Sequence, residues 1–373
     1  MKSITEIIGG AQILFNISFD IQDSFEDYLT TKHRAFLHVL RIIEEHFPAV
    51  ASSYRGRGRR PHDDVAIIRA FMAKSFFQIE TTTALVERLR CDSSLRRICG
   101  FKVVPSPSTF SRRLAVYANS HLLEQALSAM VSHYYKDTLV GHLSRDSTPI
   151  PAREKPIKSR KKEKPTPKRK RGRPKKGEER PKDKTRLEKQ LQQSPEYALS
   201  QLDTQCAWCC KKNSQGKTAH WKGYKLHLDV TDHGIPVTSV VTGANVHDSQ
   251  VAIPMEKLSM SRITHCYSVM DAGYDAEIIR DFITNQGRVA IVDRNKRRKH
   301  QRPPMCPATK ERYKVRSTVE RSNAHLKDWL LPKKLMVRGH AKVQFTLMTG
   351  VVCLAGIKIL QLFYLPPEQQ YAA

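Results

Sequence analysis

The sequence predicts a mixed α/β domain that follows a helical domain and is interrupted by a strongly basic segment. Up to about residue 137, apolar residues recur with the spacing of helices. From residue 138 to residue 365, short strand patterns alternate with helical ones, which is typical of a sheet covered by helices. The basic interruption lies at 153–189 and contains no aromatic residue. We therefore expect a helical N-terminal domain over 1–137 and an α/β domain over 138–365.

The N-terminal region shows four helical patterns. The first has apolar residues at i, i+3, i+4, i+7 and i+11, namely Phe36, Val39, Leu40, Ile43 and Phe47. A second helix is expected over 61–77, and a third is expected to be capped by the threonines at 81–83. Ser108 is expected to cap a fourth helix over 109–117.

Arginines decorate this helical region. Arg112 and Arg113 are expected to be exposed at the middle of the fourth helix, and four more arginines lie in a Gly-rich arm at 55–60. Short helices with basic faces suit contacts with DNA. A helix-turn-helix fits the pattern, and a plain helical bundle fits it almost as well.

The second region predicts a sheet whose strands lead to acidic residues. In order, the expected elements are a strand at 139–143, a hairpin of strands 224–229 and 237–241 around a turn at 232–234, a strand at 267–270, a helix near 276–285 and a strand at 289–291. The first strand runs into Asp146, and the strand at 267–270 ends on Asp271, with Gly273 making the turn. We expect both aspartates to stand at strand ends.

The charge of the chain indicates a polyanionic partner. The formal net charge is +28 over 373 residues, although charge alone does not separate nucleic acid from an anionic membrane. The segment 153–189 holds nineteen Lys or Arg against six Asp or Glu, together with five prolines. Such a segment cannot bury a core, so we expect it to be disordered when free.

Within that segment, the residues from Lys170 to Lys175 read Lys-Arg-Gly-Arg-Pro-Lys. This strip resembles an AT-hook, in which Arg171 and Arg173 would lie in a narrow A·T minor groove, because that groove attracts arginine through its negative potential. A generic polybasic tail that binds phosphates explains the strip equally well.

Hydropathy and cysteines bound the location of the chain. The apolar stretch 345–363 contains polar residues and is better explained as a buried core helix than as a membrane span. No signal peptide is recognisable, so eight cysteines suggest reduced thiols in a cytosolic protein. Cys206, Cys209, Cys210 and His220 lack the second ligand pair of a usual structural zinc site, so we favour simple thiols and leave their role open.

A helix expected over 312–331 carries the most informative pattern. At 100° per residue, Tyr313, Arg316, Glu320 and Lys327 fall on a stripe about 60° wide. A separate apolar stripe would dock on the core and consists of Val315, Val319, Leu326 and Leu330. An acid flanked by cations suits a site that holds metal and phosphates together. A solvated face with i,i+4 charge pairs is the simpler alternative.

Three acids, Asp146, Asp271 and Glu320, can converge at one edge of the predicted sheet. Taken singly, each aspartate could be a turn residue. Three converging carboxylates repel one another unless a divalent metal neutralises them. Oxygen ligands favour Mg²⁺ or Mn²⁺ over zinc. Together with the helix stripe, the acids indicate a metal site; His247 and Asp248 are expected nearby as a structural pair.

At this point the sequence resembles the DDE transposases of bacterial insertion sequences. The pattern Tyr-x2-Arg-x3-Glu-x6-Lys of that family is matched without a gap from Tyr313 to Lys327, and the contexts Asp-Ser-Thr and Met-Asp-Ala-Gly-Tyr-Asp match its two aspartate motifs. The stretches 220–227 and 243–249 are also similar to the family, and 55–117 is similar to its N-terminal transposase domain.

The resemblance implies an RNase H-like catalytic core that cleaves DNA at transposon ends and transfers strands into target DNA. Asp146, Asp271 and Glu320 would hold two Mg²⁺ ions about 3.5–4 Å apart. Arg316 and Lys327 would bind DNA phosphates, and Tyr313 would contact the backbone or a base. A homodimer in the synaptic complex, double-stranded DNA as the partner, no membrane, and a cytoplasmic, nucleoid-associated location are expected. A silent DNA-binding protein derived from a transposase is the alternative; a nuclease that never joins strands comes third.

Overall fold

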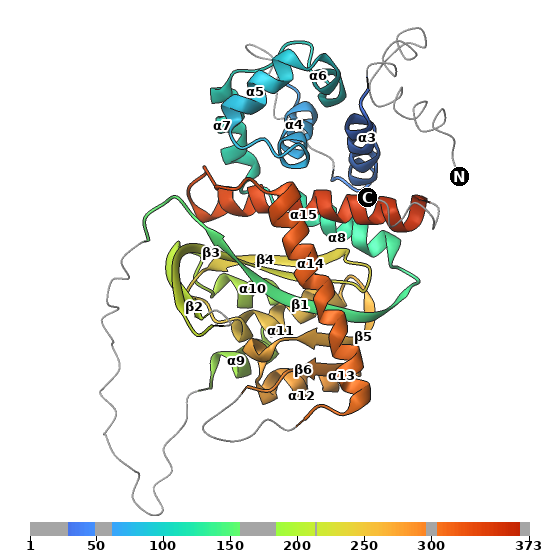
Figure 1. Ribbon diagram of the computed structural model, residues 1–373, viewed down its shortest axis with the longest axis vertical. Coiled ribbons are helices and arrows are strands. Elements are labelled where there is room, and N and C mark those ends of the chain that lie inside the picture. Colours follow the sequence, from blue (N-terminus) through green and yellow to red (C-terminus); the bar gives the residue numbers. More distant parts are fainter. Residues whose placement is uncertain (1–28, 49–61, 157–183, 213–214, 296–303, 366–373) are drawn as a thin grey trace, which may run out of the picture.

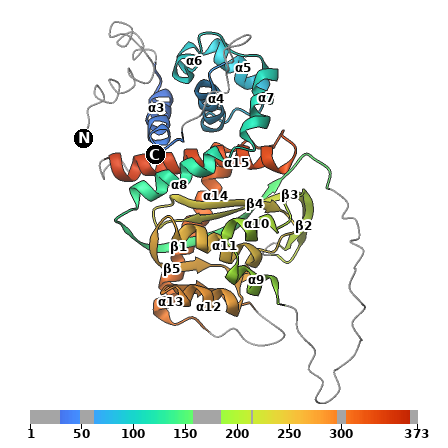
Figure 2. The same ribbon diagram turned by 180° about the vertical axis from the view of Figure 1, so that it is seen from behind.

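The computed structural model describes residues 29–48, 62–156, 184–212, 215–295 and 304–365. Helices α3 to α7 form one end of the molecule, and a mixed sheet with its covering helices forms the other (Figure 1). The long helix α15 (His340–Ile359) lies between these two parts in both views, with α8 against it on the side of the sheet (Figures 1 and 2). The mixed α/β character predicted from the sequence is confirmed.

The N-terminal part consists of six described helices. Their bounds are α3 (Thr31–Glu44), α4 (Asp64–Phe76), α5 (Thr82–Cys91), α6 (Ser93–Cys99), α7 (Pro107–Tyr117) and α8 (Leu122–Tyr134). The hydroxyl of Thr81 caps α5 as expected, by accepting from the Ala84 N–H at 3.0 Å. The prediction that Ser108 caps the fourth helix was wrong. Helix α7 begins at Pro107, because proline suits the first helical turn, and Ser106 is the N-cap residue.

Helix α15 is the central element of the core. It packs on α3, α4, α8 and strand β4, and its apolar residues belong to one buried cluster that runs from Leu29 to Ile359. Together with the turn η4 (Leu360–Tyr364) it is long and apolar enough to span a membrane by composition, but 72% of that apolar window is buried inside the protein. The predicted core helix is therefore confirmed.

The sheet has six described strands in the order β2-β3-β1-β5-β6, with β4 also paired to β3. The strands are β1 (Leu139–Pro151), β2 (Ala207–Lys212), β3 (Thr218–Val230), β4 (Pro236–Gly243), β5 (Thr264–Met270) and β6 (Val289–Val292). Strands β2, β3, β4 and β1 pair antiparallel, while β5 and β6 continue parallel to β1. The hairpin, the later strands and the helix α12 (Glu277–Asn285) confirm the predictions for this region.

Strand β1 is longer than predicted, and this changes the setting of Asp146. Beyond Asp146, β1 continues to Pro151 paired with β3 alone, so Asp146 lies inside the strand. Pro149 is tolerated there because only one side of β1 is still paired. Gly223, with φ of 152°, sits opposite Pro151, where a Cβ would lie 2.1 Å from the Ile150 carbonyl oxygen. Glycine therefore permits the close crossing of β1 and β3.

Two helices cover opposite faces of the sheet. Helix α14 (Ser317–His325) packs on β1 and β3 and runs in front of the sheet in Figure 1. Helix α11 (Ser249–Met260) packs on β3 and β4 from the other side and was missing from the sequence-based prediction. Because side chains alternate along a strand, Asp146 reaches α14 while its neighbour Arg145 reaches α11.

The structure describes both ends of the basic segment that the sequence predicts over 153–189. Residues 157–183 lie outside the described residues, whereas Arg186–Gln192 form helix α9, with Thr185 as its N-cap, and Pro195–Ser200 form α10. Glu154 is also anchored, because its carboxylate accepts the Gly339 N–H at 3.0 Å. Both ends of the segment therefore belong to the folded domain, which corrects the predicted boundary.

The predicted helix over 312–331 is a chain of helical turns of different pitch. Helix α13 (Pro307–Tyr313) passes through the 3₁₀ turn η2 (Lys314–Arg316) into α14, and the π-helical turn η3 (Leu326–Leu330) ends it. Val319, Leu326 and Leu330 are buried as expected. The changes of pitch distort the ideal stripe but keep its residues on one continuous helical rod.

Candidate active site

The sheet register brings Asp146 and Asp271 to one edge. The parallel pairing of β1 and β5 ends at Arg145 opposite Met270, so the next residues along the two strands are these two aspartates. The Asp271 carboxylate accepts the Gly273 N–H at 2.8 Å in the 3₁₀ turn η1 (Ala272–Tyr274) that follows β5. The predicted adjacency of two strand-borne aspartates is present, with Asp271 at a strand end and Asp146 within its strand.

Both carboxyl groups are destabilised in their charged form. Burial and the neighbouring Asp271 raise the pKa of Asp146 to about 6. Burial also raises the pKa of Asp271, and repulsion from Asp248 adds to this rise. Like charges held close together in a half-buried place favour protonation or a bound cation. A positive charge bound at this edge of the sheet would therefore stabilise the two ionised carboxylates.

Helix α14 brings Asn323 into contact with Asp146 and carries Glu320. The Asn323 side-chain amide donates to Asp146 Oδ2 at 3.2 Å, while the Oδ1 atom of Asn323 is buried without a hydrogen-bond partner. Glu320 stands one turn earlier on the same helix, with a side chain that is 51% exposed, and forms an ion pair with Arg316. Asn323 was missing from the sequence-based prediction, although at 100° per residue it falls beside the predicted stripe.

Arg316 forms an ion pair with Glu320 and lies close enough to Asp146 and Asp271 to interact with both electrostatically. Burial alone would lower the pKa of its guanidinium, but Tyr313, Glu320, Asp146 and Asp271 together raise it. Its guanidinium carbon lies 5.8 Å from the centre of the Tyr313 ring. Arg316 thus neutralises part of the negative charge that a metal would otherwise balance.

The carboxylates of Asp146, Asp271 and Glu320 do not form a preassembled metal site in this structure. In the part of the chain that the structure describes, no three His, Cys, Asp or Glu side chains lie close enough together to hold an ion. The same finding covers Cys206, Cys209, Cys210 and His220; Cys210 and His220 face each other across β2 and β3. Glu320 turns to Arg316 rather than to the aspartates, so its role as a third ligand remains a prediction.

Lys327 lies on the same side of the molecule. It is half-buried in η3, where burial and the nearby Lys211 lower its pKa and Asp146 raises it. Lys211 lies on β2 and was not predicted as a site residue. The structure therefore brings two lysines close enough to the acids to be felt electrostatically, which is the arrangement expected of a surface that receives phosphates.

A fourth carboxylate, that of Asp248 at the start of α11, lies near the aspartate pair. Asp248 Oδ1 accepts from Lys225 Nζ at 2.9 Å, and the Ser147 hydroxyl donates to the same carboxylate. Despite its burial, interactions with His227, Lys225 and Ser147 lower the pKa of Asp248. The predicted pairing of His247 with Asp248 was wrong: His247 is exposed and bonds Ser249 at 2.8 Å.

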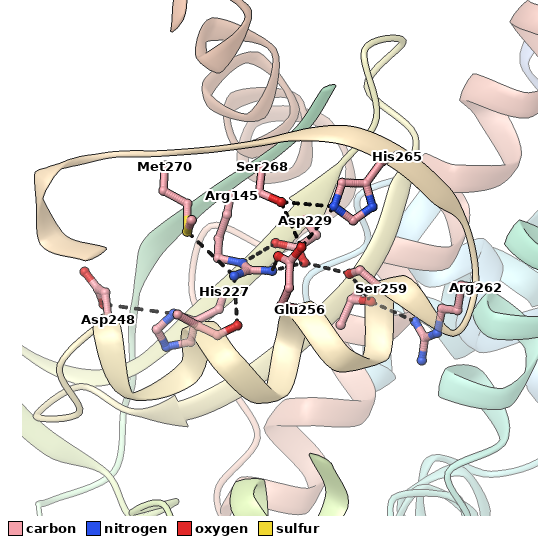
Figure 3. Close-up of polar contacts among 12 residues, drawn as sticks. Arg145, His227, Asp229, Asp248, Glu256, Ser259, Arg262, His265, Ser268 and Met270 are labelled. Carbon is pink, nitrogen blue, oxygen red and sulfur yellow. Dashed lines mark hydrogen bonds and ion pairs between the residues drawn. The ribbon is translucent and has the colours of Figure 1, made fainter. Parts of the chain in front are cut away.

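Arg145, the neighbour of Asp146 on β1, is the centre of a buried ionic network (Figure 3). Arg145 donates from Nε and Nη2 to the two carboxylate oxygens of Asp229 at 2.6 and 2.7 Å, and from Nη2 to Glu256 at 3.0 Å. Glu256 also accepts from Ser268 Oγ at 2.8 Å and pairs with His265 at 2.9 Å. Although burial would raise the pKa of Glu256, these partners lower it to about 2. The network ties β1, β3, β5 and α11 together directly beside Asp146.

The predicted DNA-binding arginines meet different outcomes. Arg112 is exposed on α7, as expected. Arg113 is not free at the surface: it forms an ion pair with Asp64, and its guanidinium lies 5.9 Å from the centre of the Tyr117 ring, so its predicted exposure was wrong. Arg171 and Arg173 fall outside the described residues.

Comparison with known proteins agrees with this geometry. The family model described as "Transposase DDE domain" matches residues 141–355, and the model described as "Transposase domain (DUF772)" matches residues 23–115. Searches of curated proteins and of solved structures gave no match. The first family model covers more than half of the chain and includes the strands and helix that carry Asp146, Asp271 and Glu320. The chain belongs to the DDE transposases, the enzymes that act on DNA in transposition.

Proposed function

We propose that this transposase cleaves DNA at the ends of its element in a metal-dependent reaction and then joins those ends to target DNA. Asp146, Asp271 and Glu320 are the proposed catalytic and metal-binding residues. The observation that carries the proposal is the placement of Asp146 beside Asp271 where the parallel pairing of β1 and β5 ends, a place where burial and Asp271 raise the pKa of Asp146 to about 6. Two acids kept adjacent against their mutual repulsion are best explained by a cation that both of them bind.

The donor set suits Mg²⁺ or Mn²⁺. All three proposed ligands are carboxylates, which these ions prefer, and the unpartnered Oδ1 of Asn323 adds one more oxygen close to Asp146. Two bound ions would supply activation of the attacking oxygen and stabilisation of the leaving one. For Glu320 to join the aspartates, it must exchange its ion pair with Arg316. Arg316 would then be free to bind a DNA phosphate.

The remaining residues of the helical rod are proposed to position DNA. Arg316 and Lys327 would bind backbone phosphates, because guanidinium and ammonium groups form charge-assisted hydrogen bonds to them. Tyr313, with Arg316 over its ring, would contact the backbone or a base. Arg112 would bind phosphate from the N-terminal helices, and Arg113 would do so only after leaving Asp64. Arg171 and Arg173 would act as an AT-hook or as part of a polybasic arm.

We further infer that the catalytic part has an RNase H-like core. The support is the strand pattern, with β4, β3 and β1 antiparallel and β5 and β6 continuing parallel to β1. A domain boundary near residue 137, a homodimer in the synaptic complex, and a cytoplasmic, nucleoid-associated location belong to the same proposal. So does a DNA-binding role for the basic segment 153–189, of which 157–183 lies outside the described residues.

The direct test is a reaction with purified protein, Mg²⁺ and a duplex that carries the element's terminal repeat, identified from the flanking DNA. We expect nicking or cutting at the end of the repeat, followed by joined products when target DNA is present. Binding without cleavage under these conditions would favour a silent DNA-binding protein. Cleavage without joined products would favour a nuclease.

A further inference from the structure

A basic pocket lies on the side of α14 opposite the acids. Its volume is about 380 Å³, and it lies between α14, the β3–β4 turn and the end of α15. Arg321 and His325 of α14 and Lys358 of α15 line it. At about 100° per residue, Arg321 and His325 point roughly 100° and 140° away from Glu320, whereas Asn323 points about 60° the other way. The pocket and the acidic site therefore lie on opposite flanks of one helix.

The cations of this pocket lack acidic partners. Arg321 Nη2 donates to Thr318 Oγ1 at 3.2 Å, and Lys358 Nζ donates to Gln361 Oε1 at 3.0 Å. Among the described residues, neither cation forms an ion pair within 4.0 Å. Asp232 also lines the pocket, but its carboxylate accepts from the backbone and the ring of His142 at 2.9 and 3.0 Å.

Electrostatic repulsion among these side chains supports the same view. Burial and the neighbouring Arg321 lower the pKa of Lys358. Burial and Lys358 lower the pKa of His325, while Asp328 raises it. The charged groups of Arg321 and Lys358 are thus held together at a cost that an anion between them would remove. None of the described residues that line the pocket is Phe, Tyr or Trp, and its only rings are those of His233 and His325, so it offers a nucleotide base little surface for stacking. The chemistry fits a phosphate group.

The shape of α14 indicates where that phosphate comes from. The outward ridge between the two flanks is exposed and includes Ser317, Glu320 and Ala324. A helix with its side chains is about 10–12 Å across, and the major groove of B-DNA is about 12 Å wide. We propose that the pocket of Arg321, His325 and Lys358 binds a backbone phosphate of the DNA strand across the groove from the strand held at the acids. This inference rests on DNA binding by the proposed active site but not on cleavage.

The test compares DNA binding by two double variants at several salt concentrations. Arg321→Gln with Lys358→Gln should weaken binding of the terminal-repeat duplex about ten- to hundredfold. It should also make the slope of log K against log salt less negative by about 0.9 for each phosphate that is no longer neutralised. The matched control, Arg321→Lys with Lys358→Arg, keeps both charges and should keep the slope of the unmodified protein. An unchanged slope in a folded Gln variant would overturn the proposal.

Ethylation interference identifies the phosphates involved. The Gln variant should lose sensitivity at phosphates on one strand, and Lys327→Ala should lose sensitivity at phosphates on the opposite strand. Loss at the same phosphates would contradict a separate pocket. If inorganic phosphate raises the Tm of the unmodified protein but not of the Gln variant, while the DNA slope stays unchanged, the pocket binds a soluble anion and the proposal fails. All of these measurements read binding, so they remain valid if no cleavage is observed.

Discussion

Replacing Asp146 by asparagine should stabilise the metal-free protein at neutral pH. Burial and Asp271 raise the pKa of Asp146 from 3.8 to about 6. At about 1.36 kcal/mol per pKa unit, the ionised carboxylate costs the folded state about 3 kcal/mol. Asparagine keeps an oxygen that can accept from Asn323 and removes the charge. We therefore expect Asp146→Asn to raise the free energy of unfolding by up to about 3 kcal/mol at pH 7.

The pH dependence follows from the direction of this shift. The folded protein holds the proton more tightly than the unfolded chain, so the free energy of unfolding falls as pH rises from about 4 to about 6. The difference between Asp146→Asn and the unmodified protein should be absent below that range and complete above it. Urea unfolding in EDTA at several pH values measures it directly.

A matched control and a metal titration complete this test. Asp137→Asn replaces an exposed aspartate and should change stability by less than about 0.5 kcal/mol. Mg²⁺ should stabilise the unmodified protein and have less effect on Asp146→Asn, because the ion binds the folded state through that carboxylate. An Asp146→Asn variant that is no more stable than the unmodified protein at pH 7 would refute the claim that the ionised Asp146 carboxylate destabilises the metal-free fold.

Three further predictions address other parts of the molecule. Deleting 157–183, which holds fourteen Lys or Arg and four Asp or Glu, should weaken non-specific DNA binding and flatten its salt dependence by about 0.9 for each phosphate that the segment neutralises; an unchanged slope would exclude a DNA arm. Lys327→Ala should bind end DNA more weakly but still cut it at saturating DNA in single-turnover assays. Arg316→Lys should weaken DNA binding although it keeps the charge, because an ammonium group cannot form the bidentate hydrogen bonds of a guanidinium. If Lys327→Ala binds DNA like the unmodified protein but does not cut it, Lys327 is catalytic. Arg145→Met removes the arginine partner of the buried carboxylates of Asp229 and Glu256 and should cost about 3–5 kcal/mol in urea unfolding. The exposed Arg112→Met should cost less than about 0.5 kcal/mol, and equal losses would contradict the structural role of the network.

Local signals predicted much of the fold. Three features depend only on residues that are close in the sequence, and the structure contains all of them: the period-two hairpin, the capping threonine before α5 and the strand that leads to Asp271. Helix α11 was not predicted because Pro254 interrupts its helical pattern and because few polar residues mark an exposed face. The end of β1 was misplaced because pairing with β3, a long-range interaction, continues past Asp146.

The site was harder to predict in its supporting residues than in its acids. The spacing of the helical rod singled out Glu320, but its ion pair with Arg316 depends on side-chain geometry that no spacing reveals. Asp248 reaches Ser147 and Lys225 only through the packing of α11 on the sheet. Arg113 looked exposed on its own helix, and only the approach of Asp64 from α4 removes it from the surface.

The central claim is that Asp146, Asp271 and Glu320 together hold the metal that cleaves DNA. Its most direct test is single-turnover cleavage of terminal-repeat DNA in Mg²⁺ by the three alanine variants, with DNA affinity measured in parallel. We expect each of Asp146→Ala, Asp271→Ala and Glu320→Ala to bind DNA nearly as tightly as the unmodified protein and to leave it uncut. Cleavage at the unmodified rate by any one of them would remove that residue from the catalytic site.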